Sequence, residues 1–426
     1  METSVNGVTA TPAVYEIGGR RIEIESRGFA EALADAYAAH QRPRCLCQAE
    51  GVEMYVARLA GSSGGYIVKR MPDTGSHHAP ACPSYEPPAE FSGLGEVLGS
   101  AITEDLATGE TTLKLDFPLT KMPGRLQVPP LGGQSDSASS SGNKLSLRGL
   151  LHYLWDQAEL TRWHPGFAGK RTWATVRRHL LLAAANKFTG SGALRTRLYV
   201  PEPFSVEARD AINARRLAHW RQAVAAPGKP QQLMLLIGEV KEIVPARYGF
   251  KAVVKHVPDQ GFMVDERLYR QLGRRFEPEL ALWGAAKGIH MVMIATFCVA
   301  TGVPAVVDVS LMPVTQQWLP VEDPFEKQLF DRLVGERRSF VKGLRYDLNA
   351  GSEVANAMLT DCEDSTPRLS EVHPGSKGNH GSGQHLQIGD PSVPVWLWDP
   401  SSEAMPALPR RQPHQPSTVE TPVAFR

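Results

Sequence analysis

The sequence predicts an α+β protein with a small β-rich N-terminal module, a helical segment, a mixed α/β core and a disordered C-terminal tail. Three observations predict this class. Apolar residues recur at helical spacing between residues 145 and 224 and then give way to short runs rich in Val, Ile and Met. Those runs alternate irregularly with two helical stretches, which argues against a doubly wound sheet. The 426 residues, 42% of them hydrophobic, suffice for a sizeable core in two or three domains.

The N-terminal region, residues 1–128, carries a hairpin pattern within residues 40–90. Alternating runs at 52–59 and 66–69 flank a glycine-rich turn at 61–65. A Cys-x-Cys pair precedes the first run, and two adjacent histidines and a third cysteine follow the second. Because a hairpin brings its two ends together, we expect these side chains to be neighbours in space.

Three cysteines and a histidine at one hairpin mouth match the ligand set of tetrahedral zinc. The predicted ligands are Cys45, Cys47, His78 and Cys82, with His77 as the alternative histidine. Four protein ligands leave no open coordination position, so the zinc is expected to be structural. The competing interpretation is that Cys45 and Cys47 are incidental and that the histidines belong to a surface loop.

The cysteine count also bears on the compartment. Five cysteines are too few for a disulfide framework in a chain of this length, and the odd number fits a reducing environment. Cys298, within an apolar run, is expected to be a buried core thiol, and Cys362 to be partly exposed. No run approaches the roughly 20 apolar residues of a membrane span, and the N-terminus lacks a basic leader. We therefore expect a cytoplasmic protein without a membrane partner.

Two stretches are typical of disorder. Residues 129–144 are rich in Ser, Gly and Pro without apolar periodicity, which predicts a flexible linker. Residues 374–426 form a Gly- and Pro-rich tail, in which only a short segment at 393–398 is expected to dock back onto the folded protein.

Residues 145–230 form a basic helical segment. Helices are predicted at 145–163, 171–187 and 206–224, the last with Ser205 before its start. The formal net charge of the whole chain is +1, yet residues 160–230 hold thirteen Lys and Arg against three acidic residues. Such a helical face could meet phosphates, and the predicted nucleic-acid contacts are Arg171, Arg177, Arg178, Arg215, Arg216 and Arg221. The alternative is a solvated basic face that pairs with the acidic remainder of the protein.

Residues 231–373 are predicted to form the mixed α/β core. Its short apolar runs, bounded by Gly or Pro, indicate buried strands, and two longer stretches indicate helices. The strands are expected at 232–244, 251–257, 289–298 and 305–311, and the helices at 265–286 and 323–337.

The end of this core contains a candidate carboxylate set. Restriction-endonuclease-like enzymes hold Mg²⁺ with carboxylates from a helix and two strands, and a lysine positions the attacking water. The matching residues here are Glu326, Lys342, Asp361 and Glu371, although His373 stands where the lysine usually follows. A competing set is Glu239 with Lys241. Ordinary solvent-facing charge is the plain alternative for both sets.

Five segments of the chain are distinctive as strings: Cys45-Leu46-Cys47, Gly-Val-Glu-Met-Tyr-Val at 51–56, Tyr-Ile-Val-Lys-Arg-Met-Pro at 66–72, the ten residues at 77–86 and Phe-Val-Lys-Gly-Leu-Arg-Tyr-Asp at 340–347. Together they resemble an uncharacterised family of bacterial proteins, domain of unknown function number 1173, found on integrative and conjugative elements. The resemblance covers roughly residues 10–370. It implies a mobile-element protein of undefined activity and favours a DNA-related role.

These observations predict a zinc-binding accessory protein of a mobile element that binds nucleic acid through its basic helical segment. It would act by binding rather than by turnover, with nucleic acid and other mobile-element proteins as partners. The alternatives are a Mg²⁺-dependent nuclease built on residues 320–373 and a protein-interaction factor whose zinc only staples a small domain.

Overall fold

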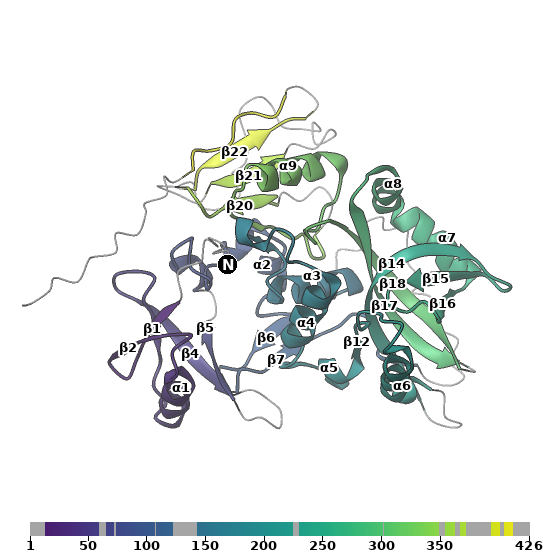
Figure 1. The fold of residues 1–426 in the computed structure, drawn as a ribbon, viewed down its shortest axis with the longest axis horizontal. Helices are drawn as coiled ribbons and strands as arrows, with labels where there is room; N and C mark the ends of the chain where they lie inside the picture. The colour runs from purple at the N-terminus through teal and green to yellow at the C-terminus, as the bar shows by residue number, and fades with distance from the viewer. Residues whose placement is uncertain are drawn as a thin grey trace, which may run out of the picture.

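The computed structural model describes residues 13–58, 65–71, 74–106, 108–121, 143–224, 230–300, 302–348, 354–362, 367–371, 393–400 and 404–411. Within them the protein is a mixed α+β structure, as predicted (Figure 1). Nearly all of the predicted turn at 61–65, the linker at 129–144 and the disordered parts of the tail lie outside these residues.

The N-terminal module is a five-stranded sheet with one helix packed against it (Figure 1). Its strand order is β2-β1-β3-β4-β5, and β4 pairs with β5 antiparallel, which confirms the predicted hairpin. The helix buries Leu33 against Tyr15 and Met54 of the sheet. The elements are β1 (Val14–Ile17), β2 (Arg20–Glu23), α1 (Phe29–Ala38), β3 (Arg44–Cys45), β4 (Val52–Arg58) and β5 (Tyr66–Arg70).

Short elements connect this module to the helical segment. A four-stranded sheet of order β11-β10-β7-β6 combines two strands that precede the helical segment with two strands from within it, and its β7 and β10 run parallel. A second, two-stranded sheet pairs β8 with β13. The elements are the 3-10 turns at Gly75–His77 and Ala89–Phe91, α2 (Leu94–Val97), β6 (Ile102–Glu104), β7 (Thr111–Leu113), β8 (Thr120–Lys121), β10 (Lys187–Thr189), β11 (Gly192–Ala193) and β13 (Gln231–Gln232).

The helical segment contains α3 (Leu147–Gln157), α4 (Trp173–Ala183), α5 (Leu194–Arg197) and α6 (Arg209–Trp220). Ser146 and Thr172 cap α3 and α4 through their hydroxyls, so both helices begin later than predicted. Both also end earlier, because residues 162–163 and 187–189 join sheets instead. The predicted start of the third helix near Val206 is wrong: Ala208 is its N-cap. Ser205 accepts from the Ala208 amide and donates to the Glu207 carboxylate, in the turn before the helix.

The core between residues 234 and 315 is a five-stranded sheet that closes on itself. Its order is β14-β15-β16-β18-β17, and β17 pairs back onto β14. All neighbours are antiparallel except β16 and β18, which run parallel. The short β12 (Leu198–Tyr199) pairs in parallel with Leu235 and Leu236 near the start of β14. The barrel strands are β14 (Met234–Pro245), β15 (Phe250–Val254), β16 (Gly261–Val264), β17 (Ile289–Ala300) and β18 (Val303–Thr315).

The single helix predicted at 265–286 is wrong, because two helices occupy this stretch. They are α7 (Glu266–Arg275) and α8 (Glu277–Ala285), which meet at Phe276. Pro278 lies in the first turn of α8 and has no amide proton to continue the hydrogen bonds of α7. Phe276 and Leu272 pack into the barrel interior with Phe262.

A last sheet collects strands from distant parts of the chain, in the order β22-β21-β20-β19-β9. α9 (Pro324–Gly335) buries Phe330 against Phe340 of this sheet. β22 pairs with β21 in parallel, which confirms the predicted docking of the segment near 393–398. The expectation that only this segment of the tail docks is wrong, because Met405 and Leu408 pack against the same core and Arg332 donates to the Met405 carbonyl. The strands are β9 (Arg162–Trp163), β19 (Phe340–Lys342), β20 (Ala357–Leu359), β21 (Arg368–Glu371) and β22 (Val395–Trp398). In the described parts of the chain, no helix combines the length and hydrophobicity needed to cross a membrane.

Candidate metal centre

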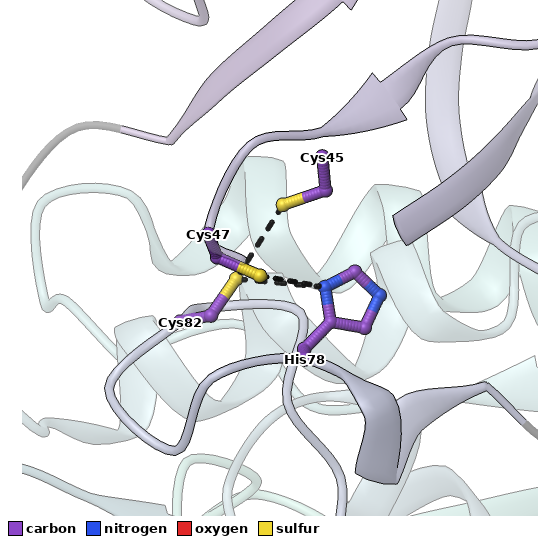
Figure 2. Close-up of side chains that lie close together, drawn as sticks. All are labelled: Cys45, Cys47, His78 and Cys82. Atoms are coloured by element: carbon purple, nitrogen blue, oxygen red, sulfur yellow. Dashed lines mark hydrogen bonds between the residues drawn. The ribbon is translucent and has the colours of Figure 1, made fainter. Parts of the chain in front are cut away.

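Four side chains of the N-terminal module point toward one another (Figure 2). Cys45 ends β3, and Cys47 lies two residues later in the turn that leads into β4. His78 follows the 3-10 turn Gly75–His77, and Cys82 is one helical turn further along the same loop. The two ends of the β4–β5 hairpin therefore supply two candidate ligands each, as the sequence pattern predicts.

The distances between the four ligand atoms suit a tetrahedral metal ion. Zn–S bonds near 2.3 Å and Zn–N bonds near 2.0–2.1 Å place sulfurs about 3.8 Å apart and a sulfur and a nitrogen about 3.5 Å apart. Cys45 Sγ lies 3.7 Å from Cys82 Sγ. His78 Nδ1 lies 3.3 Å from Cys47 Sγ and 3.8 Å from Cys82 Sγ. All four ligand atoms lie within 4.8 Å of one another, so a zinc-sized ion fits between them.

The two adjacent histidines have different environments. His78 is 1% exposed, and its Nδ1 faces the sulfurs. His77 is exposed at the end of the 3-10 turn. The geometry therefore selects His78 from the two histidines that the sequence left open.

The site favours a thiolate at Cys82, whereas burial raises the pKa of the Cys47 thiol. Backbone amides of Ala79 and Ser84 donate to Cys47 Sγ and Cys82 Sγ at 3.4 and 3.3 Å. Hydrogen bonding with Cys45 lowers the pKa of the Cys82 thiol to about 4. Hydrogen bonding to Cys82, together with burial, raises the pKa of Cys45. The two thiols thus share one proton, which a coordinated dication would displace.

Two residues of the nuclease hypothesis, Glu326 and Lys342, lie together in the protein interior. Glu326 is buried at 2% exposure beside Lys342, whose Nζ lies 2.5 Å from Glu326 Oε1. Asn356 donates to the same oxygen at 2.8 Å. This arrangement is a buried ion pair in the protein interior, and burial raises the pKa of Glu326.

The other carboxylates of that hypothesis have different surroundings. The Asp361 carboxylate forms an ion pair with the Arg338 guanidinium at 2.7 Å and accepts a hydrogen bond from the Ser339 amide at 2.9 Å. Glu371 ends β21 opposite Trp398. In the competing set, Glu239 is buried between Lys255 and His290 rather than beside the exposed Lys241.

The predicted nucleic-acid residues divide into internal and exposed groups. Arg171 donates to the carbonyls of Leu160 and Gln317 at 2.9 and 3.3 Å, and its guanidinium lies 5.3 Å from the ring centre of Trp163. Burial lowers the pKa of Arg171 to about 10.

The remaining five divide as follows. Arg216 is buried against Asp259, Arg215 is bidentate to Glu202, and Arg177 donates to the Val200 carbonyl. Arg178 and Arg221 are exposed and form no ion pair with a described carboxylate.

The sequence reasoning missed the polar partners that hold these groups. The amides that bond the sulfurs carry no signal in the sequence, since any non-proline residue supplies one. Asn356 and Asp259 are also invisible at the level of motif, because each meets its partner across 30 or more residues.

Comparison with known proteins agrees with the resemblance seen in the sequence. The family described as protein of unknown function (DUF1173) matches residues 15–401. No curated protein and no solved structure matches the chain. The chain therefore belongs to the DUF1173 family of proteins of unknown function.

Proposed function

We propose that this protein is a zinc-binding accessory protein of a bacterial mobile genetic element that acts by binding nucleic acid. The observation that carries the zinc part is the convergence of Cys45, Cys47, His78 and Cys82 at tetrahedral spacing. All four ligands come from the protein, so the ion would stabilise the fold rather than activate water.

The zinc would fasten the loop at 78–86 to the N-terminal sheet. That loop continues to Tyr85, which is buried in the same core as the ligands and whose carbonyl accepts from Arg162 of β9. Glu86 next to it pairs with Arg70 of β5. One metal ion would therefore hold both the hairpin and the contact between the N-terminal module and the helical segment.

The nucleic-acid part is supported by the charge of the helical segment. Residues 160–230 hold thirteen basic and three acidic residues, and part of this excess remains at the surface. Lys170, Arg178, Arg209 and Arg221 are exposed and lack an ion pair within the described chain. Exposed cations without partners are available to replace counterions on phosphates, which makes binding fall steeply with salt.

The test combines metal content with salt-dependent binding. Purified full-length protein should carry about one zinc per chain, and Cys45→Ser with Cys82→Ser should carry none. A gel shift should retard nucleic acid near 50 mM salt and lose this binding at higher salt. Unchanged zinc in the double variant would refute the metal site, and no binding at low salt would refute the nucleic-acid role.

The nuclease alternative gains no support from the geometry. A Mg²⁺ site needs carboxylates that converge and remain accessible, whereas Glu326 and Asp361 each already hold a cation. Plasmid nicking with Mg²⁺ or Mn²⁺, compared between the natural chain and Asp361→Ala, separates this alternative. If the protein neither cleaves nor binds nucleic acid, the result favours the third candidate, a protein-interaction factor.

A further inference from the structure

The closed sheet of the core has the topology of a known class of ligand-binding barrel. Numbered from β14, its five strands follow the order 1-2-3-5-4 and return to 1, with the third and fifth parallel. The helices α7 and α8 lie between the third and fourth strands. A five-stranded Greek-key barrel of this kind is the OB architecture, which binds ligands on its second and third strands and on the loop between the first two.

We propose that the outer face of β15 and β16, together with the loop at 246–249, binds single-stranded nucleic acid. This inference rests on the proposed function in taking nucleic acid as the ligand, and it assigns the contact to the barrel rather than to the helical segment. The loop at 246–249 joins β14 to β15, which is the connection that such barrels use for ligands.

The barrel has one covered side and one open side. Leu235 and Ile237 of β14 and Ile294 of β17 pack outward against α3 and α4 in a shared hydrophobic core. Strands β15 and β16 lie on the side of the barrel away from those helices (Figure 1). Their outward residues Lys251 and Met263 are opposite each other, exposed and half-buried respectively. The open side is therefore the one that carries β15 and β16.

The open side is basic. Residues 241–275 contain eight Lys and Arg against four acidic residues. Three of those acids are already engaged, as Asp259 pairs with Arg216, Glu266 pairs with Arg270 and Asp265 caps α7. By contrast, Lys241, Arg247 and Lys251, which lie on β14, on the loop and on β15, form no ion pair with a described residue. A polyanion would meet an excess of unpaired positive charge here.

The loop at 246–249 presents an aromatic ring to solvent. Tyr248 is 76% exposed, and the Arg247 guanidinium lies 5.4 Å from the centre of its ring. Gly249 has φ +83°, and a Cβ there would meet the Val264 carbonyl oxygen at 2.8 Å, so the loop packs closely on the end of β16. The loop therefore holds Tyr248 at the rim of the open face.

An exposed aromatic ring beside cations favours single strands over duplexes. Unpaired bases stack on aromatic side chains while their phosphates follow a basic groove, and this stacking tolerates any base. In a duplex the bases are stacked on one another and unavailable to Tyr248. The chemistry of this face is therefore that of a single-strand binder with weak sequence preference.

The test measures binding of fluorescein-labelled dT20 to the full-length protein by anisotropy at several salt concentrations, with a 20-bp duplex in parallel. Tyr248→Ala should weaken dT20 binding roughly tenfold or more, and Tyr248→Phe should retain it. Arg247→Gln with Lys251→Gln should lower the slope of log K against log salt by about 1.4, since each single-strand phosphate contact contributes about 0.7. All these side chains are exposed, and circular dichroism checks that each variant is folded.

The competing assignment is tested by Arg178→Gln with Arg221→Gln, which removes two exposed cations that the proposed function makes available to phosphates. The matched control is Arg20→Gln with Arg21→Gln, which removes two exposed cations of β2 that lie in neither surface. Loss of dT20 binding in the barrel variants but not in the control supports the inference. Loss only in the helical-segment variant overturns it and leaves the proposed nucleic-acid role in place. Equal or tighter binding of the duplex than of dT20 also overturns it. If no nucleic acid binds at low salt, both this inference and the nucleic-acid part of the proposed function fail.

Discussion

Replacing Cys82 by serine removes the ligand whose pKa is lowest among the three thiols. Its Sγ lies 3.7 Å from Cys45 Sγ and 3.8 Å from His78 Nδ1, at the edges expected of a zinc tetrahedron. Structural zinc sites contribute about 10–16 kcal/mol at pH 7, or about 2.5–4 kcal/mol per ligand if the four share it equally. Cys82→Ser should therefore weaken zinc binding by roughly 10²–10³-fold.

The assay is competition for zinc between the purified full-length protein and a chromophoric chelator. The chain offers two matched controls. His77→Ala should leave the zinc affinity unchanged because His77 is exposed, whereas His78→Ala should weaken it as Cys82→Ser does. Cys298→Ser replaces a buried thiol in β17 that belongs to no ligand group and should also leave the affinity unchanged. Equal zinc affinity in Cys82→Ser and Cys298→Ser would refute the reasoning.

Two further predictions concern stability. Lys342→Met leaves the buried carboxylate of Glu326 without its cation and should lower the free energy of unfolding by about 3–5 kcal/mol. Urea denaturation measures this loss. Lys327→Met, on α9 beside Glu326, breaks only a surface ion pair with Asp331 and should lower the free energy of unfolding by less than about 1 kcal/mol. Equal losses in the two variants would contradict a stabilising role of the buried ion pair. Burial raises the pKa of Asp156 from 3.8 to about 7. Between about pH 4 and 7 the unfolded chain therefore loses a proton that the folded chain keeps, and the free energy of unfolding falls as pH rises. Asp156→Asn should flatten this fall, and an unaltered pH profile in denaturation measurements would count against it.

The candidate metal centre could be predicted from sequence because its information is local. Two Cys/His clusters flank one hairpin, and hairpin geometry alone brings Cys45 and Cys82 together. The sequence could prefer His78 but not exclude His77, since that choice depends on the path of a 3-10 turn that only the packed loop defines.

Which basic residues are exposed could not be predicted from the sequence, for a different reason. A charge count cannot separate Arg216, which is buried against Asp259 43 residues away, from the exposed Arg221. The partner of each arginine is set by tertiary structure. The sequence shows the excess of positive charge in residues 160–230, but it does not identify which of these side chains are exposed at the surface.

The fold class was predictable from the periodicity of the apolar residues, whereas the barrel was not. Closure depends on β16, a four-residue strand that the sequence reasoning missed, and on its parallel pairing with β18. The surroundings of β14 also change along the strand: Leu235 packs against the helices, whereas Lys241 lies at a β-bulge and is exposed to solvent. By contrast, Pro278 is a local sequence signal for the break between α7 and α8, which the prediction of a single helix at 265–286 did not use.

X-ray absorption at the zinc K-edge of the purified full-length protein tests the central claim most directly. The account predicts about one zinc per chain with three sulfurs near 2.3 Å and one nitrogen near 2.0–2.1 Å. These scatterers correspond to Cys45, Cys47, Cys82 and His78. A protein without bound zinc, or zinc surrounded only by oxygen and nitrogen, would contradict it.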